Sequence, residues 1–419
     1  DDGYIYLKTK VTYAELEGYR IAVIGTENVD KETRQEMQMH KYEQLFIFTA
    51  ANIYMGILQI ELDTQMTSRI MHKDGKIIVE DVGRWDEYVK DNLPEITPRF
   101  VINDPNLRAE LSAEYGSQYF IETESASGIR YVLNAGVWFT SAGLPAYASG
   151  LGKNRLIVNL WHGVPLKKIA LLDPNLQKMS RIYFRKIFSE NYTYVLTTSH
   201  ALVPLMAKSF DISEDLIKVW GQPRNDGMFQ PNDPALILSG IYPDLPEFER
   251  TVLYAPTFRD YGQVRLFPFD DFDLNRMEAF LEEHKMLLFI RTHIAEQGSA
   301  APYLGKRIRF LGNEQAEDVT GILNIFDCLI TDYSSIYIDY LLTDKSMIFL
   351  PYDRTDYLNG RGMNFDYDEV TPGPKPDTFQ SFLDALLTED SHWKTERDRV
   401  NLLFNEIHEP CSAQICEQI

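Results

Sequence analysis

Short apolar runs alternate with helix-like stretches from about residue 118 onward, and this alternation limits the fold more than any other feature. Such a pattern favours parallel strands, each followed by a helix that covers the sheet. A Pro- and Asp-rich segment at 230–246 divides the runs into two series. The chain is therefore predicted to be an α/β protein with two Rossmann-like lobes facing a cleft.

The predicted strands lie at 130–137, 156–160, 192–198 and 216–220 in the first series, and at 251–254, 286–290, 308–311, 328–331 and 347–350 in the second. We predict an N-terminal lobe at 111–230 and a C-terminal lobe at 231–419. Residues 1–110 carry short β-like pieces at 4–7, 20–24, 45–48 and 76–79, and are interpreted as an accessory region or an irregular start of the first lobe. Ser199 is expected to cap a helix beginning at His200, with His200 on the surface.

Two uncharged stretches, 44–60 and 131–152, are interpreted as buried strand and loop segments. The first is too short to cross a bilayer comfortably, and the second contains Pro145 and several glycines. No signal peptide is expected, because the first residues lack a basic segment followed by an apolar core.

Charge and cysteine content exclude some classes of function. The net charge of −21 disfavours a general nucleic-acid-binding surface, so an anion site must be local. The three cysteines have no metal-ligand spacing, and we expect a reducing compartment without disulfides.

A histidine stands where the predicted strand at 156–160 ends, in the sequence Trp161-His162-Gly163-Val164-Pro165-Leu166-Lys167-Lys168. Ligands of open α/β sheets bind at this edge. Gly163 lets backbone approach a ligand closely, and Lys167 suits an anionic substrate. The alternative interpretation is a histidine that caps the core beside solvated lysines.

Three strands of the second series also end in polar residues. Thr257 and Arg259 follow the first strand, Arg291 and His293 follow the second, and the run 331–335 follows the fourth. Two residues apart on a continuing strand, Arg291 and His293 would share one face and reach one phosphate. The three ends are expected to meet at one edge of the sheet.

The run Thr331-Asp332-Tyr333-Ser334-Ser335 precedes a predicted helix. Free N–H groups of a first helical turn favour a phosphate or pyrophosphate, and the hydroxyls of Thr331, Ser334 and Ser335 add donors. Ordinary N-capping by Ser334 or Ser335 is the alternative. The later segment Asn364-Phe365-Asp366-Tyr367-Asp368 has a spacing that would suit a divalent metal, but acidic loops are frequent in this chain and no metal site is assigned.

A basic amphipathic helix is predicted at 175–191. Leu176, Met179, Tyr183 and Ile187 form its apolar stripe, and residues 167–190 hold six basic and two acidic side chains, a net charge of +4. Such a helix is a candidate for an anionic membrane surface. Alternatively, its apolar side packs on the lobe.

In this order the motifs resemble the CDP-glycerol glycerophosphotransferase family, which includes teichoic acid primases and polymerases and related capsule polymerases. The matching pieces cover roughly residues 118–390 and are the stretch from Trp161 to Lys168, Gly221-Gln222-Pro223-Arg224-Asn225-Asp226, Tyr254-Ala255-Pro256-Thr257-Phe258-Arg259, Arg291-Thr292-His293, Leu329-Ile330-Thr331-Asp332-Tyr333-Ser334-Ser335, and Arg361-Gly362 followed by Pro372-Gly373-Pro374. Val164 and Ile294 depart from the family's usual Thr and Pro, which leaves acceptor and donor preference open.

The resemblance implies a GT-B architecture and transfer of an alditol phosphate from CDP-glycerol or CDP-ribitol to a lipid-linked or polymeric acceptor, with release of CMP. It implies His162 as general base, since imidazole titrates near pH 6.5, and His293 with Arg291 as stabilisers of the transferred phosphate. Thr257, Arg259, Thr331, Ser334 and Ser335 would bind the donor phosphates, and Asp332 would orient their loop. The remaining expected contacts, with the acceptor or in its loop, are Gly163, Lys167, Arg224, Asn225 and Arg361.

The resemblance further implies a bacterial cytoplasmic location at the inner face of the cell membrane. No cofactor is expected to be required, and a divalent metal stays open. Two other functions stay open on the sequence: a GT-B glycosyltransferase that uses a CMP- or UDP-sugar, and a non-catalytic nucleotide- or polymer-binding protein. Histidines at strand ends in both predicted lobes favour an enzyme over a binding protein.

Overall fold

The computed structural model describes residues 12–16, 19–23, 99–141, 143–259, 264–292, 294–312, 315–316, 318–388 and 391–418. These residues fall into two compact units. Of the described residues, the first unit contains 12–16, 19–23, 99–157 and 177–192, and the second contains 158–176 and 193–418. The predicted lobe boundaries, 111–230 and 231–419, stay a prediction.

The first unit begins with an antiparallel pair, β1 (Thr12–Leu16) and β2 (Tyr19–Val23). β3 (Phe100–Val101) and β4 (Phe120–Ile121) then form a parallel pair on either side of α3 (Pro105–Tyr115). The predicted piece at 20–24 corresponds to β2, whereas those at 4–7, 45–48 and 76–79 lie outside the described residues.

The predicted strand at 130–137 is wrong. The chain forms helix α4 (Ala126–Asn134), and strand β5 (Val137–Thr140) follows it. The Oγ of Ser125 accepts a hydrogen bond from Gly128 N, which caps the helix at its N-terminus. Trp138 then donates its indole N–H to the carbonyl of Val132, so the strand folds back on the helix that precedes it.

The predicted helix at 175–191 is shorter than expected. α5 (Lys178–Phe184) continues as one π-helical turn, η4 (Arg185–Ser189), and Asn175 and Leu176 are not helical. Within the expected apolar stripe Ile187 is buried, but Met179 is 51% exposed. Ile182, outside that stripe, is 45% exposed.

Parallel strands lead to the candidate site in the second unit. β6 (Leu156–Asn159) ends in this unit and pairs in parallel with β7 (Tyr194–Thr197), which pairs in parallel with β8 (Ile217–Val219). β6 and β7 are largely buried, as expected for a parallel sheet covered by helices such as α6 (Val203–Phe210), whereas only Ile217 of β8 is buried. The structure confirms all three predicted strands within two residues.

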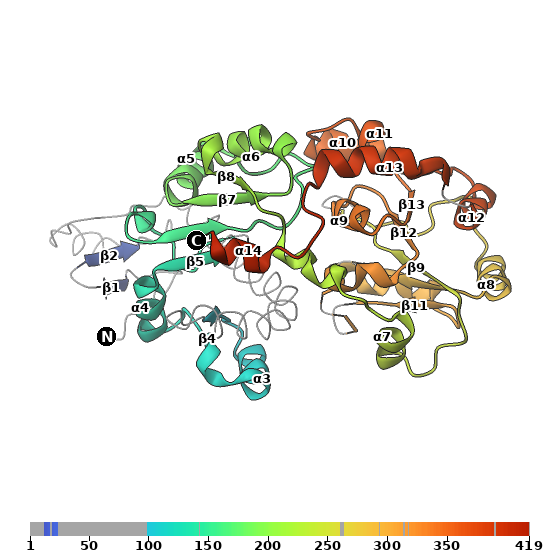
Figure 1. The fold of residues 1–419 in the computed structure, drawn as a ribbon, viewed down its shortest axis with the longest axis horizontal. Helices are drawn as coiled ribbons and strands as arrows, with labels where there is room; N and C mark the ends of the chain where they lie inside the picture. The colour runs from blue at the N-terminus through green and yellow to red at the C-terminus, as the bar shows by residue number, and fades with distance from the viewer. Residues whose placement is uncertain are drawn as a thin grey trace, which may run out of the picture. The chain divides into compact units, whose positions relative to one another are not determined.

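A second parallel sheet has the strand order β11-β10-β9-β12-β13 (Figure 1). Its strands are β9 (Arg250–Tyr254), β10 (Met286–Ile290), β11 (Ile308–Phe310), β12 (Cys328–Thr331) and β13 (Ser346–Phe349). In chain order this is the 3-2-1-4-5 arrangement of a Rossmann-like sheet. All strands are parallel, but the chain adds strands to one side of β9 first and then, from β12 onward, to its other side, so the switch point lies between β9 and β12. Ligands of such sheets bind at this switch point, beyond the carboxyl ends of the strands.

Helices α8 (Leu274–Glu283) and α12 (Phe379–Leu387) contribute to the buried core of this sheet. The other elements of the unit are α7 (Pro234–Ile241), α9 (Ile336–Tyr340), α10 (Arg354–Arg361), α11 (Tyr367–Val370), α13 (Ser391–Phe404) and α14 (Ser412–Glu417), with short helices η3 (Ala170–Leu172), η5 (His200–Leu202), η6 (Glu214–Leu216), η7 (Pro223–Phe229), η8 (Ile294–Tyr303), η9 (Thr320–Ile325) and η10 (Leu341–Thr343).

The end of α13 and the segment after it bond back to the loop that follows β7. Thr198 Oγ1 donates to the carbonyl of Phe404, and Ser199 Oγ donates to Leu403 O at 2.7 Å. The expected capping role of Ser199 is therefore wrong. Instead, the Oε1 of Glu406 accepts from His200 N at 2.7 Å and caps η5 from the far end of the chain. His200 is on the surface, as predicted.

No helix among the described residues is long and apolar enough to cross a membrane. The uncharged stretch at 131–152, apart from residue 142, consists of the end of α4, β5, loops and the start of the short helix η2 (Leu151–Lys153). The interpretation as a buried strand and loop segment is therefore right only in part, because the stretch begins in a helix and most of its residues are partly or fully exposed. The stretch at 44–60 lies outside the described residues.

Candidate active site

His162 lies in a strained turn directly after β6. Its neighbours Trp161 and Gly163 have φ values of +59° and +129°, in the region that L-residues avoid. The Oδ1 of Asn159 accepts from Trp161 N at 2.9 Å, and Gln222 Nε2 donates to the carbonyl of Leu160 at 2.9 Å. Two amide side chains from different strand ends therefore hold the turn that presents His162.

Gly163 packs against two residues that sequence reasoning assigned to the same site. A Cβ at this position would lie 2.7 Å from Nη2 of Arg224 and 3.3 Å from Oγ of Ser335. Only a residue without a side chain allows this approach, in addition to the positive φ. The structure thus brings Gly163, Arg224 and Ser335 together beside His162.

The loop that follows pairs with the segment directly after α10. Lys167 and Met363 form an antiparallel bridge, and Asn364 Nδ2 donates to the carbonyls of Pro165 and Lys167, both at 2.8 Å. Lys167 Nζ lies 5.1 Å from the ring centre of Tyr357. The loop after His162 and the segment after α10 are therefore held together by backbone and side-chain hydrogen bonds. Arg361 ends α10, but its side chain lies outside the described residues.

At the switch point, Asp332 joins the ends of β9 and β12. Its Oδ1 accepts from the backbone N of Thr257 at 2.8 Å and of Tyr333 at 2.6 Å, and its Oδ2 accepts from Arg259 at 2.8 Å. The Oγ1 of Thr257 is buried there without a hydrogen-bond partner. A buried hydroxyl with no partner is uncommon, and at a sheet switch point it is a ready donor for a ligand.

Arg259 is bound to protein carboxylates. Its guanidinium donates to Asp353 at 2.6 Å and 3.0 Å, to Asp332, and to the carbonyl of Thr257 at 2.6 Å. Burial alone would lower the pKa of Arg259, but Asp332 and Asp353 raise it above its ordinary value. These bonds favour a scaffold role for Arg259 over the expected contact with donor phosphate.

The hydroxyls of the 331–335 run differ in their surroundings. Thr331 is fully buried and its Oγ1 donates to Ala255 O at 2.7 Å, which ties β12 to the loop after β9. Ser334 and Ser335 are half-buried, and Ser334 Oγ lies 3.4 Å from Ile336 N. Helix α9 has five residues and no cap from its N-cap side chain. Ser334 and Ser335 therefore remain the accessible candidates for a phosphate contact.

Arg291 points into a neighbouring loop. Its Nη1 donates to the carbonyls of Leu311 at 3.1 Å and Ala316 at 2.8 Å, and burial lowers the pKa of its guanidinium to about 10. His293 lies outside the described residues. The role in phosphate stabilisation that the resemblance implies for His293 therefore stays a prediction.

The segment at 364–368 uses its carboxylates within the protein. Asp366 Oδ1 caps α11 by accepting from Asp368 N at 2.9 Å, and Asp368 pairs with Arg354 at 2.8 Å. Within the described part of the chain, no group of three or more His, Cys, Asp or Glu side chains is arranged to hold a metal.

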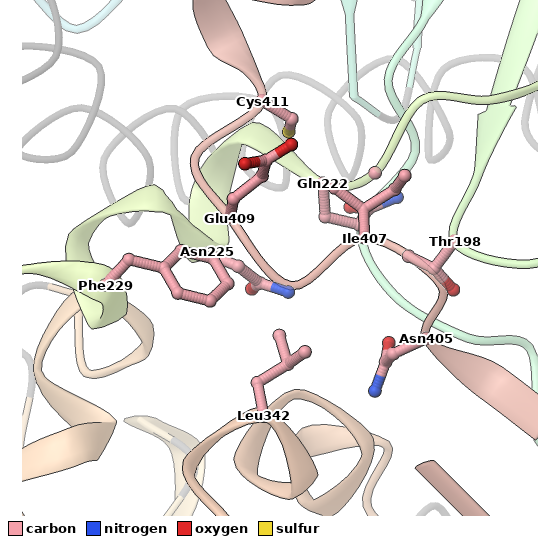
Figure 2. Close-up of a pocket in the computed structure, with 10 residues that line it drawn as sticks. Thr198, Gln222, Asn225, Phe229, Leu342, Asn405, Ile407, Glu409 and Cys411 are labelled. Atoms are coloured by element: carbon pink, nitrogen blue, oxygen red, sulfur yellow. The ribbon is translucent and has the colours of Figure 1, made fainter. Parts of the chain in front are cut away.

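A small pocket adjoins the site through Asn225. Figure 2 shows side chains from η7 and from the C-terminal segment around it; the lining residues are Thr198, Gly221, Gln222, Asn225, Phe229, Leu342, Asn405, Ile407, Glu409 and Cys411. Asn225 Nδ2 donates to Oδ1 of Asp339 at 3.0 Å. Asp339, Asp353 and Gln222 are site residues that sequence reasoning did not select, because the partners that place them in the site are 62 or more residues away. Asn159 was also missed, although its partner Trp161 is only two residues away.

Over residues 32–418 the chain matches the family described as CDP-glycerol:poly(glycerophosphate) glycerophosphotransferase. The teichoic acid poly(glycerol phosphate) polymerase of Bacillus subtilis strain 168 is 26% identical over 318 residues, which cover 72% of this chain and 41% of that protein. The teichoic acid poly(ribitol-phosphate) polymerase of Bacillus spizizenii strain W23 is 27% identical over 277 residues, 65% of this chain and 44% of that protein. The chain thus spans less than half the length of these relatives.

Among solved structures, the wall teichoic acid polymerase TagF aligns with a TM-score of 0.56 and 20% identity, over 77% of this chain and 85% of that chain. This likeness confirms the predicted GT-B-like α/β fold class. The family match extends over nearly the whole sequence and includes every motif of the site. The chain therefore belongs to the CDP-glycerol:poly(glycerophosphate) glycerophosphotransferase family.

Proposed function

We propose that this chain transfers glycerol phosphate, or a related alditol phosphate such as ribitol phosphate, from a CDP-linked donor to a hydroxyl of a lipid-linked or polymeric acceptor. The proposed product belongs to teichoic acid or capsule synthesis. The match to the family over residues 32–418 carries the proposal. Relatives that are named for glycerol phosphate and for ribitol phosphate are about equally similar, so the alditol is a matter for experiment.

In the proposed reaction, the acceptor oxygen attacks the β-phosphorus of the donor. The new P–O bond forms as the bond from the β-phosphorus to the bridging oxygen breaks, and CMP leaves with that electron pair. His162 accepts the hydroxyl proton. Catalysis then rests on positioning and on neutralising phosphate charge.

The proposed donor contacts are the accessible hydroxyls of Ser334 and Ser335 and the unpartnered hydroxyl of Thr257. His293 would stabilise the transferred phosphate, whereas Arg291 donates to the carbonyls of Leu311 and Ala316 and would support the neighbouring loop. Arg224 supplies positive charge next to Gly163, and Lys167 and Arg361 would serve the acceptor side. The displacement requires no cofactor in this proposal, and a chelator arm in the assay tests that point.

A donor screen tests the function directly. The purified chain is incubated with CDP-glycerol, CDP-ribitol, a CMP-sugar or a UDP-sugar, together with a lipid-linked acceptor analogue. We expect CMP release and a mass gain of one or more alditol phosphates with a CDP-alditol only, with and without EDTA. Release of UDP, or sugar transfer from a CMP-sugar, would instead indicate a glycosyltransferase. Donor binding without turnover on any acceptor would indicate a binding protein.

We also propose that α5 binds the anionic inner face of the cell membrane, where a lipid-linked acceptor would be reached. Its exposed apolar residues Met179 and Ile182 stand among the exposed basic residues Lys178, Arg185 and Lys186. Apolar side chains that insert at the interface and cations that attract anionic headgroups support each other in such helices.

Vesicle co-sedimentation tests this placement. The chain is expected to bind vesicles containing phosphatidylglycerol, and more weakly vesicles of phosphatidylcholine alone. The double change Met179→Glu and Ile182→Glu should reduce binding at least about tenfold, because it removes apolar contact and cancels positive charge. The control Leu236→Glu, at a 73% exposed apolar residue of α7, should bind like the unchanged chain. Equal binding by both variants would refute the assignment to α5.

A further inference from the structure

Asp339 is a buried carboxylate of α9 that binds two consecutive residues of η7. The residue is 4% exposed. Its Oδ2 accepts from Arg224 Nη2 at 2.5 Å, and its Oδ1 accepts from Asn225 Nδ2 at 3.0 Å. Both carboxylate oxygens are therefore used to hold the segment that follows β8.

The same guanidinium nitrogen that binds Asp339 is the one that lies against Gly163. Nη2 of Arg224 is 2.7 Å from the position that a Cβ on Gly163 would take, and the Oγ of Ser335 is 3.3 Å from that position. Ser335 precedes Asp339 by four residues, so both stand at the start of the chain segment after β12. Asp339 thus links the turn of His162 to the run that carries Ser335.

A free arginine side chain would not keep this place by itself. Fixing its rotamers costs about 2 kcal/mol of conformational entropy, and a charge-assisted hydrogen bond to a buried carboxylate offsets that cost. The ion pair is largely buried, with side-chain exposures of 18% for Arg224 and 6% for Asp339. Salt therefore screens it less than an exposed pair.

We infer that Asp339 is a positioning residue for the transfer reaction. Through Arg224 it holds Gly163, and with it the adjacent general base His162, in register with Ser335. This inference rests on the proposed function for its effect on turnover. A displacement of about 1 Å at reacting groups can lower turnover on the order of 10²-fold, so a residue that touches no substrate can still have a large effect.

A double-mutant cycle tests the inference. Asp339→Asn and Arg224→Ala should each lower kcat about 10- to 100-fold, while the KM for CDP-glycerol or CDP-ribitol changes less than about threefold. If Asp339 acts through Arg224, the double variant should be no slower than Arg224→Ala alone. Additive losses, or a wild-type kcat in Asp339→Asn, would overturn the inference.

Gly163→Ala is a second variant that leaves the carboxylate in place. The added Cβ would collide with Arg224 Nη2 at 2.7 Å and would also strain a residue with positive φ, so kcat should again fall at nearly constant donor KM. A Gly163→Ala variant with unchanged kcat would contradict the contact on which the inference depends.

The matched control is Asp226→Asn. Asp226 lies in η7, the short helix that contains Arg224, and like Asp339 it is 4% exposed. Its two carboxylate oxygens accept from the backbone N of Cys411 at 2.9 Å and of Ser412 at 3.0 Å. This change should lower stability but leave the kcat of the folded protein within about twofold. It therefore separates loss of structure from loss of positioning.

A readout without turnover keeps the two proposals separable. Hydrogen exchange of the backbone at 160–168, followed by mass spectrometry, should be faster in Asp339→Asn than in Asp226→Asn. If the unchanged chain releases no CMP from any CDP-alditol, the proposed function fails. The difference in hydrogen exchange between Asp339→Asn and Asp226→Asn would still show whether Asp339 holds the turn of His162. Equal exchange in the two variants would overturn the inference.

Discussion

Replacing His162 with alanine is expected to lower turnover by about 10²–10⁴-fold while leaving binding of the CDP-linked donor largely intact. That range is typical for loss of a general base, which acts on the proton of the attacking hydroxyl in the transition state. The turn around His162 is held by Asn159 and Gln222, so the substitution removes the imidazole without removing those two bonds. Steady-state CMP release and donor binding by calorimetry give the two quantities.

His200→Ala is the matched control for this prediction. His200 is a surface histidine of the same unit, and its Nδ1 lies 2.7 Å from a carboxylate oxygen of Glu406. Its loss should leave turnover within about twofold. Near-normal turnover of His162→Ala would remove that residue from its proposed role, and a parallel loss of donor affinity would place it in donor binding instead.

Replacing Arg259 with methionine is expected to destabilise the protein by about 3–5 kcal/mol, the range for breaking a buried ion pair by removal of one partner. The side chains of Arg259 and Asp332 are only 5% and 2% exposed. The substitution would leave Asp332 and Asp353 as two close carboxylates without their shared cation. Urea unfolding, monitored by tryptophan fluorescence and by circular dichroism, measures the effect.

Arg265→Met serves as the control, because Arg265 pairs with Asp270 on the surface at 2.9 Å. Exposed pairs contribute about 0–1 kcal/mol, so this change should be nearly neutral. A stable Arg259→Met protein with strongly weakened donor binding would restore the role in phosphate binding expected from the sequence. Loss of stability with near-normal donor binding in the folded fraction would support the scaffold role.

The sequence predicted the strands of the two parallel sheets well because buried parallel strands are continuous apolar runs. β10 and β12 have the predicted limits, and β6, β7 and β8 differ by at most two residues. The error at 130–137 has a local cause. Tyr131 and Val132 favour strands by propensity, but the cap at Ser125 starts a helix that includes them.

The candidate site was only partly predictable. Residue type and position at a strand end identified Gly163 and Ser335, and the family resemblance added Arg224; the structure brings the three together. The same reasoning could not distinguish an arginine that is available to bind a ligand from one that forms ion pairs within the protein. Arg259 is of the second kind, because it pairs with Asp332 and Asp353. That distinction depends on partners 73 and 94 residues away, which periodicity and spacing in a single sequence do not reveal.

The bonds from the C-terminal segment to the loop after β7 also determine when the second unit can finish folding. Thr198 and Ser199 bind carbonyls that lie 206 and 204 positions later, and Asp226 binds backbone groups about as distant. Contacts across such separations form slowly, since the intervening loop must be closed first. A nascent chain that stops before α13 already contains both sheets but lacks these bonds. In the cell, the loop after β7 therefore stays exposed during translation, which is the interval when chaperone binding and aggregation compete with folding.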